Sequence, residues 1–184
     1  MTLKFTKSDY KVVSGGQTGV DQAGLQAAKD CGIATGGWAP KNWETLDGPQ
    51  RALLKSFGLK EHDGGYRQRT IQNIKDSDIT VCISRKWGSP GTVLTINSCV
   101  RHMKPFIALT EDFVLKNSAG VSPRFKDNFA SKTTKNSKIK LLGEVLANFH
   151  VINVAGNAEQ NASGIYDNSY NMLTEVFRSM VSDM

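Results

Sequence analysis

The 184-residue sequence lacks the features that mark several large protein classes. Its three cysteines are an odd number without zinc-type spacing, so neither a disulfide framework nor a cysteine-held metal is expected. Its three histidines show no paired spacing, so we expect no protein-ligated metal. No apolar run reaches the roughly 18 residues that cross a bilayer, and the first residues lack an apolar signal-peptide core. We therefore expect a cytoplasmic protein with no membrane partner.

Several catalytic and nucleotide-binding motifs are also missing. No lysine follows the first glycine loop as a Walker A loop requires, and its spacing, G-G-x-x-G, differs from the dinucleotide-binding pattern. The sequence has no G-x-S-x-G elbow and no H-E-x-x-H zinc motif. The catalytic candidates therefore reduce to acids near predicted loops, of which we retain Asp21 and Asp78.

What the sequence does contain is an ordinary globular composition and a regular alternation of strand and helix patterns. Hydrophobic residues make up 39% of the chain and charged residues 22%. Strands are predicted at 10–13, 33–35, 79–83, 105–109 and 150–154, amphipathic helices between or after them, and a loop at 131–138. This alternation predicts an α/β fold: a single Rossmann-like three-layer domain over residues 1–184, with a mostly parallel sheet of about five or more strands and helices on both faces.

The most informative segment is the junction between the first predicted strand and the first helix, where the chain reads SGGQTG. Glycines let backbone N–H groups approach an anion closely, and the helix N-terminus adds a partial positive charge. We therefore predict a phosphate cradle formed by Gly15, Gly16, Gln17 and Thr18, with Asp21 beside it. The alternative is a glycine turn that serves packing alone.

A second glycine loop, WGSPGT, follows the third predicted strand and again opens a helix. Its candidate ligand contacts are Gly88, Ser89, Gly91 and Thr92. Because ligands of parallel sheets bind outside the strand carboxyl ends, both loops are expected to face one crevice. Each helix N-terminus favours an anion by roughly 0.3–1 kcal/mol. The alternative is a plain turn in which Thr92 caps the helix.

Three further residues are candidates for contact with the same ligand. Arg69 has the fork geometry for bidentate phosphate binding, and pairing with Asp76 or Asp78 at the surface is the alternative. Asn153 is expected at the carboxyl end of the last strand, either near the ligand or in a simple turn. The indole of Trp38 is expected either to stack on a flat ring or to fill the core.

Positive charge concentrates in the second half of the chain. The net charge is +6, and Lys116–Lys140 carries seven basic residues against Asp127 alone. A solvated basic surface is one interpretation, and attraction of an anionic ligand or of nucleic acid is the other. Aromatic residues interleave with these charges only at Phe113, Phe125 and Phe129, so nucleic-acid binding ranks last.

Six segments carry a resemblance to known proteins: SGGQTGVDQAGLQAA (14–28), GGWAPKNWETLDG (36–48), YRQRTIQNIKDSD (66–78), GSPGTVLT (88–95), KP (104–105) and VINVAGNAEQNASGIY (151–166). Together they resemble the molybdenum carrier family, in a Rossmann-like superfamily that also contains the Lonely Guy cytokinin-activating hydrolases. The resemblance implies a Rossmann-like fold and a phosphate-bearing ligand, either a nucleotide or a pterin such as the molybdenum cofactor (molybdopterin). It also implies that the metal stays on the cofactor's own sulfurs and that the protein forms a homo-oligomer.

The chain departs from these relatives at a position that bears on catalysis. Lonely Guy enzymes carry P-G-G-x-G-T-x-x-E, whose glutamate assists cleavage of the ribose–base bond, and Thr95 stands at that position. A hydroxyl group cannot supply a carboxylate's charge to an oxocarbenium-like centre, so binding or carrying a small molecule is favoured over hydrolysis. The alternatives are a nucleotide hydrolase (an N-glycosidase or phosphohydrolase) that uses Asp21 or Asp78 and, last, a nucleic-acid-binding protein.

Overall fold

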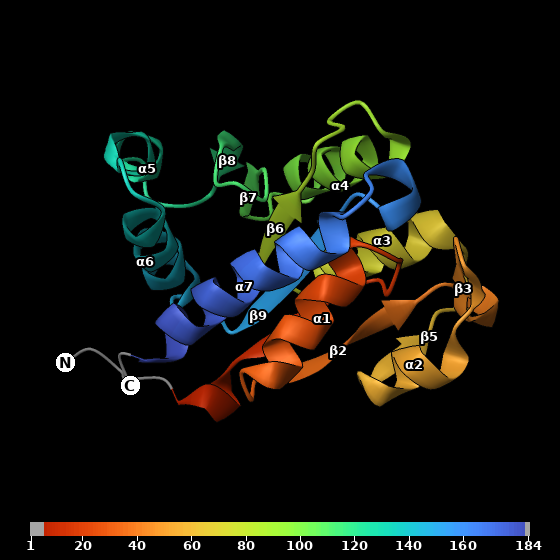
Figure 1. The fold of residues 1–184 in the computed structure, drawn as a ribbon. Helices are drawn as coiled ribbons and strands as arrows, with labels where there is room; N and C mark the ends of the chain where they lie inside the picture. Colours follow the sequence, from red (N-terminus) through yellow and green to blue (C-terminus); the bar gives the residue numbers. More distant parts are fainter. Residues whose placement is uncertain (1–5, 183–184) are drawn as a thin grey trace.

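The computed structural model describes residues 6–182, so the ends of the predicted domain, 1–5 and 183–184, lie outside the described residues (Figure 1). The strands are β1 (Lys11–Val13), β2 (Ala34–Ala39), β3 (Glu44–Thr45), β4 (Gly48–Pro49), β5 (Leu59–Glu61), β6 (Ile79–Ile83), β7 (Phe106–Leu109), β8 (Leu115–Ala119) and β9 (Val151–Gly156). The α-helices are α1 (Val20–Asp30), α2 (Arg51–Ser56), α3 (Tyr66–Lys75), α4 (Pro90–Arg101), α5 (Phe125–Ser131), α6 (Lys135–Leu146) and α7 (Ile165–Ser182).

Seven of these strands form one sheet in the order β5-β2-β1-β9-β6-β7-β8. Neighbouring strands pair in parallel except β7 and β8, which are antiparallel. The last strand, β9, lies in the centre, where Asn153 stands opposite Val13 of β1 and Thr80 of β6. The carboxyl ends of β1, β9 and β6 therefore meet at one edge of the sheet, and the loops that leave these ends start side by side.

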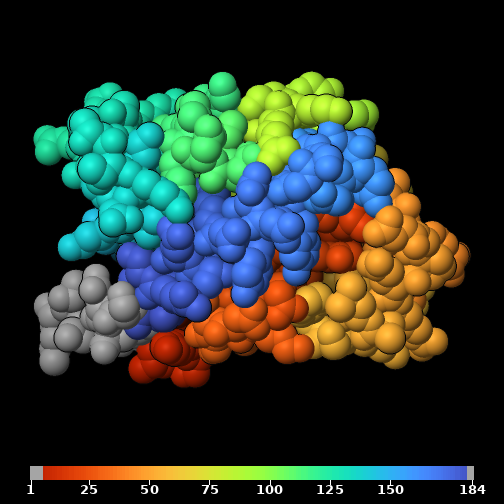
Figure 2. All heavy atoms as spheres, viewed as in Figure 1, coloured from red at the N-terminus to blue at the C-terminus, as the bar shows by residue number. Residues whose placement is uncertain are grey.

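Helices cover both faces of the sheet, which confirms the predicted α/β fold with three layers (Figure 1). In one layer α7 contacts both α1 and α6, and in the other α3 contacts α4. On the face shown in Figure 2, the blue α7 segment lies between the orange-red α1 and the teal α5–α6 segment. Every residue of β6 is buried, as expected for a strand covered on both sides. None of the helices within residues 6–182 is long and apolar enough to cross a membrane.

The structure also contains elements that the sequence did not predict. β5, α2 and the β3–β4 hairpin are too short to show a clear period, and β8 leaves most of its side chains exposed. The loop predicted at 131–138 was wrong in its second half, because α6 begins at Lys135. The Thr134 side chain accepts a hydrogen bond from the Ser137 N–H, and this N-cap starts the helix despite its polar sequence.

The packing of α1 on the sheet depends on a glycine. A Cβ atom at Gly24 would lie 2.6 Å from Cγ1 of Val154 in β9. We expect Gly24→Val to lower the free energy of unfolding by about 3 kcal/mol, because it overpacks this contact. Urea denaturation followed by circular dichroism measures the change. Gly88→Val is the control, since a Cβ there meets nothing within 4 Å, and equal losses in both variants would contradict the packing argument.

Candidate functional site

Residues from both glycine loops meet at one cavity at the carboxyl edge of the sheet. The cavity has a volume of about 240 Å³. Gln17 of the first loop and Ser89 and Gly91 of the second line it, and Asn157 lies between them at the end of β9. Tyr66, the first residue of α3, forms a further part of the wall. With Leu46 of the β3–β4 hairpin, the cavity is therefore built from five segments that are far apart in the sequence.

The first loop uses part of its own hydrogen-bonding capacity. The Gln17 N–H donates to Asp21 Oδ2 at 3.2 Å, and the Thr18 N–H donates to Gln17 Oε1 at 2.9 Å. The same Gln17 oxygen accepts from the Leu46 N–H at 2.8 Å, which ties the β3–β4 hairpin to the loop. The Gln17 and Thr18 amides of the predicted phosphate cradle therefore have acceptors within the loop itself, because polar side chains beside the glycines fold back onto them.

Glycines of both loops make room for side chains of α3. A Cβ atom at Gly15 would lie 1.3 Å from Nη1 of Arg69, so only glycine leaves space for the guanidinium. The guanidinium carbon lies 4.5 Å from the centroid of the Tyr66 ring, a cation–π contact. A Cβ atom at Gly91 would in turn lie 2.5 Å from the Tyr66 hydroxyl oxygen. These two glycines therefore position Arg69 and Tyr66 at the site.

Arg69 is the most informative side chain of the site. It is only 3% exposed, and its Nη1 lies 3.3 Å from Oδ2 of Asp21 in a buried ion pair. The alternative of a surface pair with Asp76 or Asp78 was therefore wrong. The Nε and Nη2 atoms of Arg69 are buried and have no hydrogen-bond partner among the described residues. These two nitrogens share the side-on edge of the guanidinium, a fork that binds an oxyanion bidentately.

Asp21 lies in the first turn of α1 and is buried beside Arg69. Burial raises the pKa of its carboxyl group, and Arg69, the Gln17 N–H and the Ser14 side chain offset part of that rise. Removing one member of a buried ion pair costs about 3–5 kcal/mol, because the other charge is left without a partner. Asp21 thus anchors the guanidinium, and its raised pKa brings it closer to protonation than an exposed aspartate.

Asn157 organises the second loop, although the sequence analysis selected Asn153 of the same segment instead. Its Oδ1 accepts from the Arg85 and Lys86 N–H groups at 2.9 and 3.0 Å. Its Nδ2 donates to Ser89 Oγ at 3.1 Å and to Thr92 Oγ1 at 3.2 Å. One side chain thus joins the loop after β6 to the start of α4. The available signal was an amide side chain three residues after the strand predicted at 150–154.

Two predicted site residues lie away from this cavity. Asn153 was expected at the end of β9 but lies inside it, where its amide donates to Thr80 Oγ1 at 3.2 Å. Asp78 precedes β6 at the opposite, amino-terminal edge of the sheet, where it accepts from the backbone N–H groups of His150 and Val151. Asn153 does not reach the carboxyl edge because β9 continues to Gly156, and Asp78 lies at the amino-terminal edge because it directly precedes β6.

Trp38 also lies outside the cavity of the glycine loops. Its indole N–H donates to Asp76 Oδ2 at 2.8 Å, and its ring meets the His62 ring edge-on. It lines a separate cavity of about 240 Å³ together with Lys11 and Asn73. The partly exposed indole therefore neither fills the core nor faces the glycine loops.

The remaining candidates of the two loops have local roles. Gly16 has a φ of 75°, which side chains rarely adopt, and a Cβ there would lie 2.7 Å from Leu54, so packing alone requires this glycine. Gly88 is open, because a Cβ atom at this position would meet nothing within 4 Å. Thr95, which replaces the glutamate of the hydrolases, donates to the Gly91 carbonyl at 2.9 Å inside α4.

The basic segment does not present its aromatic residues to solvent. Phe113, Phe125 and Phe129 are at most 2% exposed, so their rings cannot stack on bases. This removes the aromatic support for nucleic-acid binding. The three cysteines are buried and free, and within residues 6–182 no group of three or more His, Cys, Asp or Glu residues could hold a metal ion.

Fold and site together define a Rossmann-like α/β protein with two glycine loops at one edge of its sheet. The circularly permutated YpsA SLOG family matches residues 12–177, and the chain belongs to this family. A solved structure of a candidate molybdenum carrier protein from Syntrophus aciditrophicus SB is similar, with 27% sequence identity and a TM-score of 0.67 over 91% of this chain and 93% of that chain. No curated protein matches the sequence. The resemblance to molybdenum carriers is thereby confirmed.

The bonds of Asn157 give a test of how the second loop is held. We expect Asn157→Ala to lower the free energy of unfolding by about 2–3 kcal/mol, because buried N–H and hydroxyl groups lose their partner. Chemical denaturation measures the loss. Asn161→Ala is the matched control, since Asn161 lines the same cavity with an exposed side chain. A loss no larger than that of the control would show that Asn157 does not hold the loop.

Proposed function

We propose that this protein binds a phosphate-bearing small molecule, a nucleotide or a pterin cofactor, at the cavity between its glycine loops. The observation that carries the proposal is the side-on edge of Arg69, whose two buried nitrogens have no partner among the described residues. Buried donors of a charged group are costly when they lack an acceptor. An oxyanion that fills this edge removes that cost and gains two charge-assisted hydrogen bonds.

The ligand reaches Arg69 past Tyr66. The Tyr66 ring lines the cavity and also stacks on the guanidinium, so it separates the cavity from the anion-binding edge. The side chain is 41% exposed and belongs to the first turn of α3, which leaves it room to turn toward solvent. The rest of the ligand then faces Ser89 and Asn157, which supply hydroxyl and amide groups for orientation.

The function as a molybdenum cofactor carrier is one form of this proposal. It is supported by the similar structure, which is itself described as a candidate molybdenum carrier. The cofactor carries a terminal phosphate, and the unpartnered edge of Arg69 suits that group. When bound, the cofactor supplies its own sulfur ligands to the metal. We also propose that the chain forms one domain, because both loops leave the same sheet, and that it assembles as a homo-oligomer.

If the ligand binds to the two side-on nitrogens of Arg69, a substitution that keeps the positive charge but removes this pair of donors should lower the affinity. We expect Arg69→Lys to weaken binding of adenosine monophosphate at least about ten-fold, because an ammonium group cannot offer two parallel N–H bonds. Isothermal titration calorimetry measures the affinity. Arg67→Lys makes the same change on the exposed side of α3 and should leave it unchanged. Equal affinities for all three proteins would contradict the proposal, and native mass spectrometry of the purified protein would identify a retained ligand.

The charge of Asp21 predicts a pH dependence of that binding. A phosphate group on Arg69 adds negative charge near Asp21, whose pKa burial already raises, and so favours its protonated form. Burial also raises the pKa of Tyr66 and Cys82, the other titratable groups that interact with Asp21, so both stay neutral near pH 7.

Binding should therefore take up a proton, and affinity should fall as pH rises above the pKa of Asp21 in the free protein. Calorimetry in buffers of different ionisation enthalpy counts the protons. In the Asp21→Asn variant only the protons that the probe itself exchanges on binding remain. An equal proton count for the wild type and the variant would show that Asp21 does not titrate on binding.

A nucleotide hydrolase is the second candidate function, and one observation favours it. Asp21 lies beside the proposed anion site with a raised pKa, as a general acid requires. Asp78 does not support the hydrolase function, because this residue lies at the other edge of the sheet. A screen of nucleoside monophosphates for released base or phosphate decides the matter, and a blank screen removes this candidate.

A further inference from the structure

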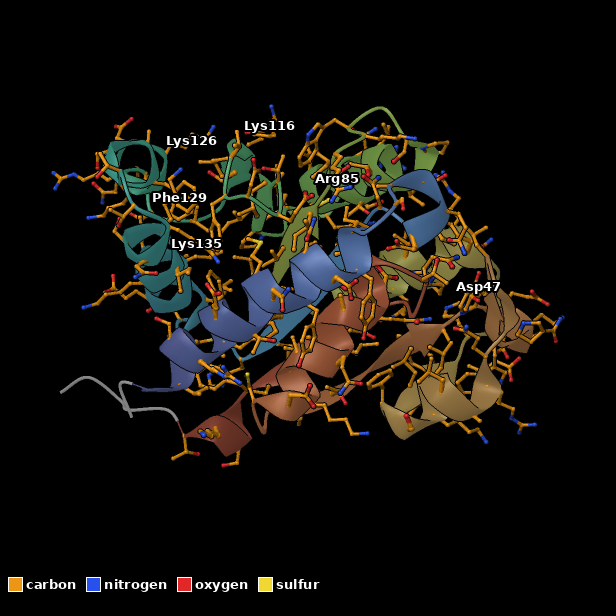
Figure 3. All side chains as sticks on the ribbon, viewed as in Figure 1. Asp47, Arg85, Lys116, Lys126, Phe129 and Lys135 are labelled. Carbon is orange, nitrogen blue, oxygen red and sulfur yellow. The ribbon has the colours of Figure 1, made fainter. Side chains whose placement is uncertain are left out.

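A cavity of about 790 Å³ lies outside the site of the glycine loops. It is bounded by the loop after β6, the turn between β7 and β8, the start of α6 and one side of α7. Figure 3 labels Arg85, Lys116 and Lys135, which come from the loop after β6, from β8 and from the start of α6. Its volume falls in the range of roughly 300–1,000 Å³ that small-molecule sites occupy.

This cavity opens at the ligand-binding edge of the sheet. Arg85 follows β6, and Thr110 and Glu111 follow β7, so the loops at two strand carboxyl ends form its wall. Such loops are where open α/β sheets bind ligands. The segment that carries Arg85 is held by Asn157, which lines the cavity of the glycine loops. The two cavities therefore lie on either side of one loop and share no lining residue.

Two lysines of the basic segment line this cavity and are available to a ligand. Lys116 in β8 has no ion-pair partner within residues 6–182. Lys135 pairs with Glu175 at 3.0 Å, but the two side chains are 57% and 42% exposed, so water screens the pair. Arg85, by contrast, is fixed by Glu111 and by a backbone carbonyl. Lys116 and Lys135 therefore supply the positive charge that an anion would meet.

The other walls suit a flat organic group. Trp87 contributes the accessible aromatic surface of the cavity, which the nearly buried Phe113 and Met172 also line. Asn168 and Asn171 lie three residues apart on α7, so their amides face the cavity from the same side of that helix. Aromatic surface next to amide groups and lysines is the combination that receives a planar ring with a charged substituent.

Acids in the wall limit the charge that the cavity accepts. Glu111 and Asp112 line it together with the three basic residues, so cations outnumber anions by one. The Oε2 atom of Glu111 is buried without a hydrogen-bond partner in the described part of the chain, which leaves an acceptor for an N–H donor. A monophosphate therefore fits this balance better than a triphosphate or a nucleic-acid strand.

We propose that this cavity is a second small-molecule site, which takes an aromatic organic anion of nucleoside monophosphate size. The ring lies against Trp87, and the anionic group lies between Lys116 and Lys135. Ring N–H groups donate to the free acceptor of Glu111. This assignment gives the basic segment a binding role and does not depend on ligand binding at the glycine loops.

Guanosine monophosphate is the probe, because its ring has N–H donors, and the fluorescence of Trp87 is the signal. We expect saturable quenching that is absent in Trp87→Phe. The double variant Lys116→Glu/Lys135→Glu should bind at least about ten-fold more weakly, measured independently by calorimetry. The control Lys132→Glu/Lys140→Glu makes the same charge change at exposed positions that do not line the cavity, and should bind like the wild type.

Three outcomes would overturn this proposal. The first is no quenching at millimolar guanosine monophosphate, and the second is an equal loss of affinity in both double variants. The third is tighter quenching by guanosine triphosphate or by a single-stranded oligonucleotide, which would assign the lysines to a polyanion surface. Arg69→Lys should leave the quenching intact, because Arg69 lies at the other cavity. Failure at one site is therefore distinguishable from failure at the other.

Discussion

The buried ion pair between Asp21 and Arg69 determines the residues that both glycine loops can contain. It fixes the guanidinium against the first loop, at a distance that only Gly15 permits. The Tyr66 ring then stacks on the guanidinium, and its hydroxyl group occupies the space beside Gly91. One pair of side chains therefore explains glycines in two loops that lie more than 70 positions apart in the sequence. Phosphate contact alone does not explain them.

Stability alone does not account for this pair. A buried ion pair is favourable only where further hydrogen bonds satisfy its remaining donors, and apolar residues of similar volume are often as stable. Only Nη1 of Arg69 has a partner, whereas the two nitrogens of the side-on edge have none among the described residues. The guanidinium is thus oriented on one side by Asp21 and left without an acceptor on the other, a preorganised arrangement of donors.

The fold could be predicted from the sequence because its signals are local. The apolar run of β6 and the spacing of buried residues in α7 identified their elements without knowledge of the rest of the chain. The site depended on contacts between distant residues. Nothing near Gly15 in the sequence indicates that Arg69 will lie against it. The last strand was predicted to end a few residues too early, so Asn153 was selected as the site residue at its end instead of Asn157. Short elements such as β5 were not predicted for a related reason, because three residues are too few to show an alternation of apolar and polar side chains.

Asn157 connects the two cavities physically. Its oxygen holds the loop that carries Arg85 toward the larger cavity, and its nitrogen holds Ser89 at the wall of the smaller one. Both bonds come from one planar amide, so moving one side of the loop changes the geometry on the other. Coupling between two sites is reciprocal in free energy. Any effect of a ligand at one cavity on affinity at the other therefore has a short path, through a single buried side chain.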